Sequence, residues 1–297
     1  MKKSIIDKVH DRLWTMVSDQ LSVKISPPTV SGTGQSDTSV SGTMDWPRAC
    51  AALANGTWKS KNFRRIHAVR QVVETLGPVD GRYFSKWIRD NAPNYLTDQR
   101  VAAIDTWGGP IRWPGVCLGT PHSFSPTTLR YLAHALWLKK EGFVREGGSV
   151  IELGVGFGGL AAMNAIVSNA TTIMVDLPSV VDAARLQMKQ LGLDHFVATH
   201  HTDTSSRDTC FISNYAFTEL SRDLQDDYAD QFIRHANRGV ILSNAAVFAD
   251  HMLSRNNNQI IELLAQHGAH ANADNNSEIL CPSDRFHGNS LMHWMDV

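Results

Sequence analysis

A glycine-rich stretch near the middle of the chain contains the residues whose spacing points most clearly to chemistry. Residues 150–160 read VIELGVGFGGL, in which a carboxylate at Glu152 precedes several closely spaced glycines. Such glycines permit a tight turn and let the backbone approach a ligand, and the following helix presents unpaired N–H groups to it. The stretch therefore predicts a loop that binds a nucleotide-type cofactor.

Two cofactors fit these glycines. Gly154, Gly156 and Gly159 satisfy G-x-G-x-x-G, the fingerprint of dinucleotide sites. Glu152 with Gly154, Gly156 and Gly158 satisfies E-x-G-x-G-x-G, the first motif of enzymes that use S-adenosylmethionine (SAM). Asp176 follows Gly156 by 20 residues (176 − 156), a distance that suits a carboxylate accepting from both ribose hydroxyls of either cofactor.

Glu152 favours SAM, because a carboxylate at this position would repel a pyrophosphate but can hold the ammonium group of SAM. The late position of the loop favours SAM as well, since dinucleotide domains more often open a chain. Two alternatives stay open. One is an NAD(P)-dependent oxidoreductase that uses the same loop, and the other is a SAM-binding partner subunit without catalysis.

Strands and helices alternate from Ser125 onward. Ser125-Pro126 is a helix start, with Ser as N-cap and Pro at the first helical position. Expected strands are 150–153, 172–175, 196–199, 209–213 and 239–243, and expected helices are 125–142, 160–167, 180–191, 217–236 and 257–267. This alternation predicts a parallel sheet with helices on both faces.

Two further strands, 278–281 and 290–294, are expected to form a C-terminal antiparallel hairpin, because the eight residues PSDRFHGN between them are too few for a parallel crossover. The fold class is therefore α/β, a Rossmann-like seven-stranded class I methyltransferase sheet. Residues 121–297 are expected to form this SAM-binding domain.

Residues 1–120 are expected to form a mainly helical cap over the carboxyl edge of the sheet, which binds the acceptor. Helices are predicted within 1–20 and over 46–53, 63–76 and 81–89. The segment 26–43 is rich in Ser, Thr, Gly and Pro and reads as a loop. Residues 104–120 are too rich in Pro, Gly and Trp for regular structure.

Five runs carry a resemblance to a known family: SPTTLRYL (125–132), the glycine loop, VDLP (175–178), SNYAFTEL (213–220) and GNSL (288–291). In these runs, over roughly residues 120 to 297, the chain resembles a family of sugar O-methyltransferases. The resemblance implies SAM as cofactor, with S-adenosylhomocysteine as product. It also implies methyl transfer to a sugar hydroxyl, in a surface polysaccharide or a glycosylated metabolite.

The methyl-transfer site is expected beyond the carboxyl ends of the strands. A sugar hydroxyl benefits from a general base, and His287 is the first choice because imidazole titrates near neutral pH. His287 would lie with Asp284 and Arg285 in the hairpin turn. The alternative is that His287 is only an exposed turn residue, without a catalytic role. Glu219 is the second choice, unless it only complements a helix dipole. The other catalytic candidates are Tyr215 beside the methyl group or the sugar, and His122 before the 125–142 helix.

The remaining cofactor candidates surround the loop. Leu177 adjoins Asp176, Asn214 follows the fourth strand, and Asp203 is a candidate partner of the adenine amine. Arg130 could hold the SAM carboxylate or form a surface pair. No metal is expected, because the fourth and fifth strands end in Ser-Asn rather than in the carboxylates that Mg²⁺ prefers.

Composition limits the partners. The 297 residues are 42% hydrophobic and 19% charged, with a net charge of −1, which gives no electrostatic case for nucleic acid. No segment approaches the ~20 apolar residues of a membrane span. Charged residues interrupt the first twenty, unlike a secretory signal. We expect a cytoplasmic protein with a sugar-containing acceptor; its oligomeric state stays open, with a homodimer as one option.

Overall fold

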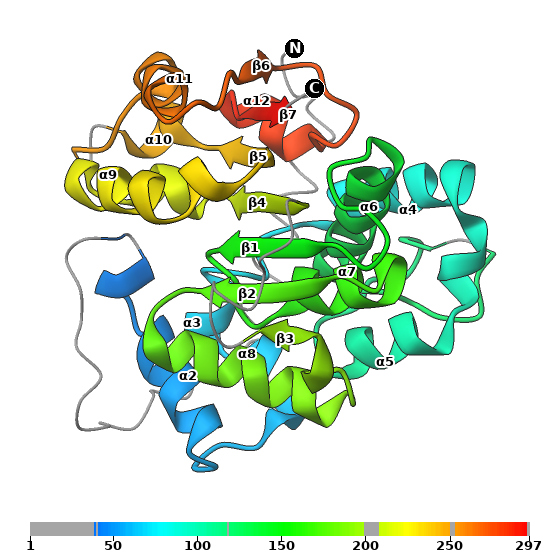
Figure 1. The fold of residues 1–297 in the computed structure, drawn as a ribbon. Coiled ribbons are helices and arrows are strands. Elements are labelled where there is room, and N and C mark those ends of the chain that lie inside the picture. Colours follow the sequence, from blue (N-terminus) through cyan, green and yellow to red (C-terminus); the bar gives the residue numbers. More distant parts are fainter. Residues whose placement is uncertain (1–38, 40, 118, 199–207, 250–252, 296–297) are drawn as a thin grey trace.

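The computed structural model describes residues 39, 41–117, 119–198, 208–249 and 253–295, and a seven-stranded sheet forms its centre (Figure 1). The strand order is β3-β2-β1-β4-β5-β7-β6. Neighbours among β1 to β5 are parallel, and β7 runs antiparallel to both β5 and β6. The expected class I methyltransferase sheet is confirmed. The strands are β1 Ser149–Leu153, β2 Thr171–Val175, β3 Val197–Ala198, β4 Thr209–Asn214, β5 Arg238–Ser243, β6 Asn272–Asp274 and β7 Ser290–Met295.

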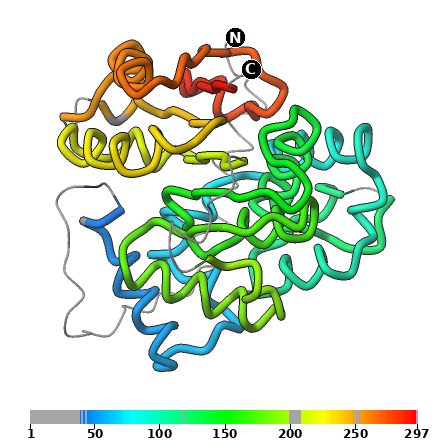
Figure 2. Tube along the Cα trace, viewed as in Figure 1, coloured from blue at the N-terminus to red at the C-terminus, as the bar shows by residue number. Residues whose placement is uncertain are grey.

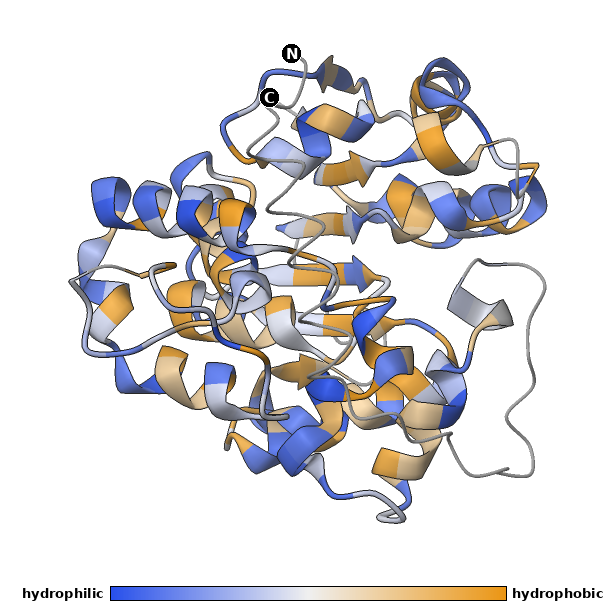
Figure 3. Ribbon diagram, turned by 180° about the vertical axis from the view of Figure 1, so that it is seen from behind, coloured by the Kyte–Doolittle hydropathy of each residue, from blue (hydrophilic) through white to orange (hydrophobic). Residues whose placement is uncertain are grey.

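Helices cover both faces of the sheet because β1 alternates its side chains between two apolar clusters. Val150 belongs to the cluster beneath α6 (Pro126–Lys140), α7 (Gly159–Ser168) and α8 (Pro178–Gln190). Ile151 belongs to the cluster beneath α9 (Arg222–Gln231) and α11 (Asn257–Gln266). Hydrophobic and hydrophilic residues alternate along the outer helices (Figure 3), as expected for helices with one packed face. None of the described helices is both long and apolar enough to cross a membrane.

The N-terminal region is helical, as expected. Helices α2 (Trp46–Ala54), α4 (Pro78–Asn91) and α5 (Gln99–Thr106) lie mainly against α8, α6 and α7 respectively, outside the sheet domain (Figure 2). Helix α4 also contacts α12 (Pro282–His287), because the Asp80 carboxylate accepts from Ser283, and the expected cap over the strand ends stays a prediction. The segment between α3 (His67–Arg70) and α4 reaches that edge, because Val73 packs against Gly156.

One continuous apolar core joins this N-terminal region to the sheet domain. It contains Trp46, Phe63 and Phe84 from the first part and Leu129 and Phe157 from the second, all nearly or fully buried. We expect residues 121–297 expressed alone to lack a cooperative thermal transition, because removing residues 1–120 would expose this core to water. Circular dichroism melts of this fragment and of the full chain test the expectation. A fragment melting within a few degrees of the full chain would contradict it.

Arg64 anchors the N-terminal region to α6. Its side chain is fully buried and forms an ion pair with Glu74 at 2.5 Å. The same guanidinium donates to the hydroxyls of Ser125 (2.9 Å) and Thr128 (3.2 Å) at the start of α6. Ser125 is the N-cap that the sequence predicts, since its side chain accepts from the Thr128 N–H. A single arginine therefore fixes where α6 begins relative to the preceding helices.

We expect Arg64→Ala to lower the free energy of unfolding by about 3–5 kcal/mol, because it leaves Glu74 buried without a partner. Lys86→Ala is the matched control: Lys86 pairs with Asp90 on the exposed surface of α4, and its loss should cost less than ~0.5 kcal/mol. Urea denaturation of both variants measures the difference. Equal losses would show that the Arg64 network contributes no more than a surface pair.

Two expected helices are shorter than predicted. Residues 63–76 form the end of a 3-10 helix (Ser60–Arg65) and the four-residue α3, because Ile66 between them has extended backbone. Residues 217–236 contain α9 from Arg222 only. The chain before it is a 3-10 turn over Ala216–Glu219, and Leu220 is extended. The backbone leaves the helical region at Ile66 in the first case and at Leu220 and Ser221 in the second, which periodicity cannot reveal.

The predicted hairpin has a different first strand. Residues 278–281 form no strand, because Ile279, Leu280 and Cys281 are buried within the core itself. The strand that pairs with β7 is the short and largely exposed β6, and the chain between them includes a helix, α12 (Pro282–His287). The predictions for the helix within 1–20, for most of the loop 26–43 and for Asp203 fall outside the described residues.

Candidate active site

The glycine loop connects β1 to α7, and three of its glycines have left-handed backbone conformations. Gly154, Gly156 and Gly158 have φ of 81°, 56° and 90°, a region that residues with a Cβ rarely adopt. A Cβ on Gly154 would also lie 2.2 Å from the Cβ of Ala216. Glycine is therefore required at Gly154 for both conformation and space, and the loop brings β1 against the segment after β4.

Asp176 holds this loop from the end of β2. Its carboxylate accepts from the Gly156 N–H at 3.3 Å and from the Leu177 N–H at 2.8 Å. Burial raises the pKa of Asp176 to about 7, although both N–H bonds lower it. Leu177 is the N-cap residue of α8 and packs against the core. The sequence spacing that connects Asp176 with the loop thus corresponds to direct contact.

Glu152 is a second carboxylate beside the loop. Its side chain is 4% exposed, and its Oε2 has no hydrogen-bond partner among the described residues. Burial raises the pKa of Glu152 well above its usual range, and the nearby charge of Asp176 raises it further. A buried carboxylate without a partner is costly, which makes this position suited to a positively charged or hydrogen-donating ligand.

Arg130 is a buried cation on α6 near the same place. It is 6% exposed, no carboxylate of the described residues pairs with it, and its Nε lacks a hydrogen-bond partner among them. Its guanidinium lies 5.3 Å from the Tyr131 ring centroid and 5.7 Å from that of Tyr215. Arg130 and Glu152 both lie near enough to Tyr131 to affect its pKa, which Arg130 lowers and Glu152 raises, while burial raises it most.

Tyr131 was not a sequence candidate, yet it adjoins the loop. Its hydroxyl lies 4.0 Å from the position of a Cβ on Gly156, and its ring would clash with a Cβ on Gly159. Phe157 of the loop packs edge-on against Tyr131 and stacks on Trp107. The signal available in the sequence was the position of Tyr131 next to Arg130 in the run SPTTLRYL.

Tyr215 and Asp284 meet at the carboxyl edge of the sheet. Tyr215 directly follows β4 with φ of 73°, an unusual conformation for a residue with a ring. Its hydroxyl donates to Asp284 Oδ1 at 2.6 Å. Burial opposes ionisation of Asp284, but hydrogen bonds from Tyr215, Cys281 and Asn289 outweigh it and lower its pKa. Burial and the Asp284 charge raise the pKa of Tyr215, so its hydroxyl keeps its proton.

Glu219 lies at the same edge, between the ends of β4 and β5. Its Oε1 accepts from Asn244 Nδ2 at 2.6 Å, and Asn244 directly follows β5. Burial raises the pKa of Glu219, and the bond from Asn244 partly offsets the rise. A carboxylate with a raised pKa is a stronger base than an ordinary one.

Asn214 Nδ2 lies 3.3 Å from His134 Nδ1. Burial, with the charge of Arg130, lowers the pKa of His134 to about 3, so its ring is neutral. His134 is a further residue that the sequence did not single out. Asn214 is therefore directed toward α6, on the side of Arg130.

Two histidine candidates are less closely connected to this edge. His287 does not occupy a turn between strands, as expected; it is the last residue of α12, exposed, with its ring 5.1 Å from that of Phe286. The expected setting was wrong because α12 occupies the connection. His122 precedes α6 by a few residues, and its ring centroid lies 6.0 Å from that of Phe124. Among the described residues, no group of three or more His, Cys, Asp or Glu is arranged to hold a metal.

No protein-family model matches this chain, and no curated protein matches it in sequence. Solved structures share its fold weakly. One is the geranyl diphosphate C-methyltransferase from Streptomyces coelicolor A3(2) with Mg²⁺, geranyl-S-thiolodiphosphate and S-adenosylhomocysteine, at 14% identity over 71% of this chain and 98% of that chain (TM-score 0.46). Another is phosphoethanolamine N-methyltransferase 2 from Haemonchus contortus, at 15% identity over 55% of this chain (TM-score 0.41). This chain spans about half of the Haemonchus protein, 52%.

Proposed function

We propose that the protein is a SAM-dependent O-methyltransferase whose acceptor is a sugar hydroxyl. The observation that supports SAM as cofactor is a set of charged groups around one loop, of which Glu152 Oε2 and Arg130 Nε are buried without a hydrogen-bond partner among the described residues. The unpartnered carboxylate of Glu152 suits its ammonium, Arg130 suits its carboxylate, and Asp176 suits its ribose diol. Leu177 and Asn214 are expected to line the same site, and Asp203 stays a proposed partner of the adenine.

The same charges disfavour NAD(P). A pyrophosphate on the loop would face the buried carboxylate of Glu152, whose pKa is raised by burial and further by the nearby charge of Asp176. SAM carries no phosphate, and its sulfonium and ammonium groups are positive. When bound, SAM supplies an electrophilic methyl group, and this chain's own residues supply position and base.

We propose that Tyr215 and Glu219 handle the acceptor hydroxyl. Tyr215 is held by Asp284, so its hydroxyl oxygen has a fixed position from which it can accept a hydrogen bond from the sugar. Glu219 would take the proton of the acceptor hydroxyl as methyl transfer proceeds. Asp284 acts through Tyr215 and is a positioning residue. Within this proposal His287 and His122 are candidates for acceptor contacts.

The sugar acceptor is supported by the sequence resemblance, which includes SNYAFTEL, the run that contains both Tyr215 and Glu219. Thr218 and Asn244 beside them are buried and already hydrogen-bonded, Thr218 to the Tyr215 carbonyl and Asn244 to Glu219, so they hold these two candidate residues in place.

Isothermal titration with SAM, S-adenosylhomocysteine and NAD tests the cofactor. We expect binding of SAM and S-adenosylhomocysteine and none of NAD; the reverse would establish the oxidoreductase alternative. Transfer of a labelled methyl group from SAM to a panel of mono- and oligosaccharides tests the reaction. Binding of SAM without transfer to any saccharide, small alcohol or amine would favour a non-catalytic partner subunit.

A further inference from the structure

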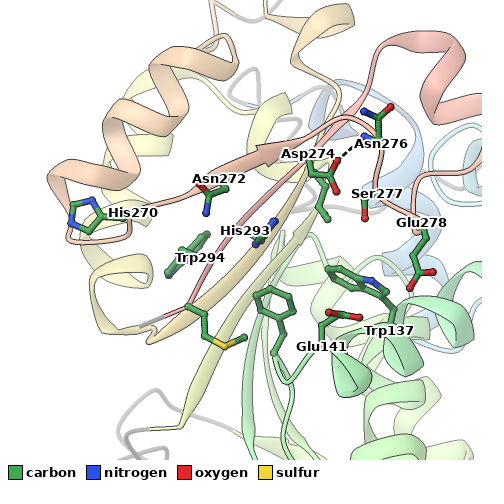
Figure 4. Close-up of a pocket in the computed structure, with 13 residues that line it drawn as sticks. Trp137, Glu141, His270, Asn272, Asp274, Asn276, Ser277, Glu278, His293 and Trp294 are labelled. Atoms are coloured by element: carbon green, nitrogen blue, oxygen red, sulfur yellow. Dashed lines mark hydrogen bonds between the residues drawn. The ribbon is translucent and has the colours of Figure 1, made fainter. Parts of the chain in front are cut away.

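A groove with a volume of about 570 Å³ lies away from the glycine loop (Figure 4). It is formed by β6 and β7, the segment after β6 and the C-terminal end of α6. Trp137 and Glu141 contribute from α6, whereas Arg130 lies near the start of that helix. At 1.5 Å per residue, the 11 residues from Arg130 to Glu141 correspond to about 16 Å. This groove is therefore distinct from the proposed methyl-transfer site.

The floor of the groove is aromatic. Trp137 and Phe143 line it and are each less than a tenth exposed, whereas the Trp294 ring stacks on Phe211 in the apolar cluster on the opposite face of β7. Trp137 stacks on Phe143 with ring centroids 5.4 Å apart, and the His293 ring meets Phe143 edge-on. Packing fixes these rings, so the floor is a preformed apolar surface.

The walls carry short polar side chains that both donate and accept. Asn272, Asn276, Ser277 and His293 project around the floor in Figure 4. No hydrogen bond of the Asn272 amide or of the His293 ring to another described residue is formed, so both can serve a ligand. Among the residues that the structure describes, no lysine or arginine lines the groove, which argues against a phosphate or another anion as ligand.

Of the three carboxylates that the described residues contribute to the groove, two already have partners. Glu278 forms an ion pair with Lys140 at 2.8 Å, and Asp274 accepts from the Asn276 N–H at 2.8 Å. A ligand that depends on positive charge would therefore meet one unengaged carboxylate, Glu141. Neutral amides, a hydroxyl and an imidazole over an apolar floor fit a ligand with hydroxyl groups on an apolar ring.

We propose that this groove is a second binding site, which takes a sugar unit of a neutral glycan chain. Its separation from the strand ends means that a glycan occupying it and the methyl-transfer edge together must be an oligomer or polymer. The inference does not require methyl transfer, because it depends on the groove alone.

A glycan array of defined neutral oligosaccharides, probed with the full-length protein without SAM, is the test. The wild type is expected to bind a subset of the array, and titration calorimetry then gives its affinity for the best-bound oligosaccharide. Asn272→Ala with His293→Ala should weaken that affinity at least tenfold. The matched control is Asn94→Ala with His195→Ala, two exposed residues outside the groove, which should leave it unchanged.

Three results would overturn the proposal: no glycan bound by the wild type, equal affinity for the groove variant, or spermidine bound in preference to every glycan and lost in that variant. Thermal melts accompany each titration, and the single variant Asn272→Asp, which keeps the side-chain volume, serves if the double variant is unstable. Since binding is measured without cofactor, failure here leaves the methyl-transfer proposal separately testable.

Discussion

Glu219→Gln is expected to lower kcat about 10²–10⁴-fold while SAM affinity stays nearly unchanged, because a positioned general base contributes that much to proton transfer. Burial raises the pKa of Glu219, so the wild-type rate should rise with pH through that raised value, as the carboxylate ionises. The glutamine variant should lose this step in the pH profile. Single-turnover methyl transfer at several pH values measures both effects.

The matched control is Glu262→Gln, which removes a carboxylate from the exposed surface of α11 and should leave kcat unchanged. His287→Ala discriminates the alternative base. If His287 takes the proton, its removal should produce the large loss of kcat. Full activity of both the Glu219 and His287 variants would mean that the enzyme works by positioning alone.

Asp176→Ala is expected to weaken SAM binding at least tenfold at pH 8, about 1.4 kcal/mol, through loss of a charge-assisted bond to the ribose. The pKa of Asp176 in the free protein is about 7, so wild-type affinity should fall as pH drops below 7 and the carboxylate is protonated. The variant should lack the part of this dependence that comes from Asp176. Titration calorimetry between about pH 6 and about pH 8 follows the change.

The folding stability of the ligand-free protein should depend on pH in the opposite direction from its affinity for SAM. Because the folded-state pKa of Asp176 is raised above its unfolded value, the ligand-free protein binds more protons than the unfolded chain in the window between the two. Its stability should therefore fall as pH rises from about 4 to about 7. Asp182→Asn, on the exposed side of α8, is the control for both measurements. SAM affinity unchanged by Asp176→Ala would remove Asp176 from the cofactor site.

Local sequence patterns were sufficient for the elements that carry the cofactor loop. The β1–loop–α7 unit, the N-cap at Ser125 and Asp176 at the end of β2 are confirmed within a residue or two. Each rests on a signal contained in a few adjacent residues: glycines where φ is positive, a capping hydroxyl before proline, and β-branched runs in buried strands. Such signals survive packing because the backbone conformation itself demands them.

The C-terminal hairpin could not be located in the same way. The run Ile279 to Cys281 is apolar because it fills the core, while the true partner of β7, β6, is short, polar and largely exposed. An edge strand of three residues contributes too little burial to leave a hydrophobic pattern. The helix α12 spans six residues, which is less than two turns, so periodicity could not indicate it either.

The sequence by itself determined that the chain has an alternating α/β sheet with a glycine loop and an acidic residue at a cofactor spacing. Tertiary structure alone decided which buried charges remain without partners and which candidate residues contact one another. Tyr215 and Asp284 are separated by 69 residues yet share a hydrogen bond, and Glu152 of β1 and Arg130 of α6 both lie near enough to Tyr131 to affect its pKa. Burial and pairing depend on packing between distant segments, and no local spacing contains that information.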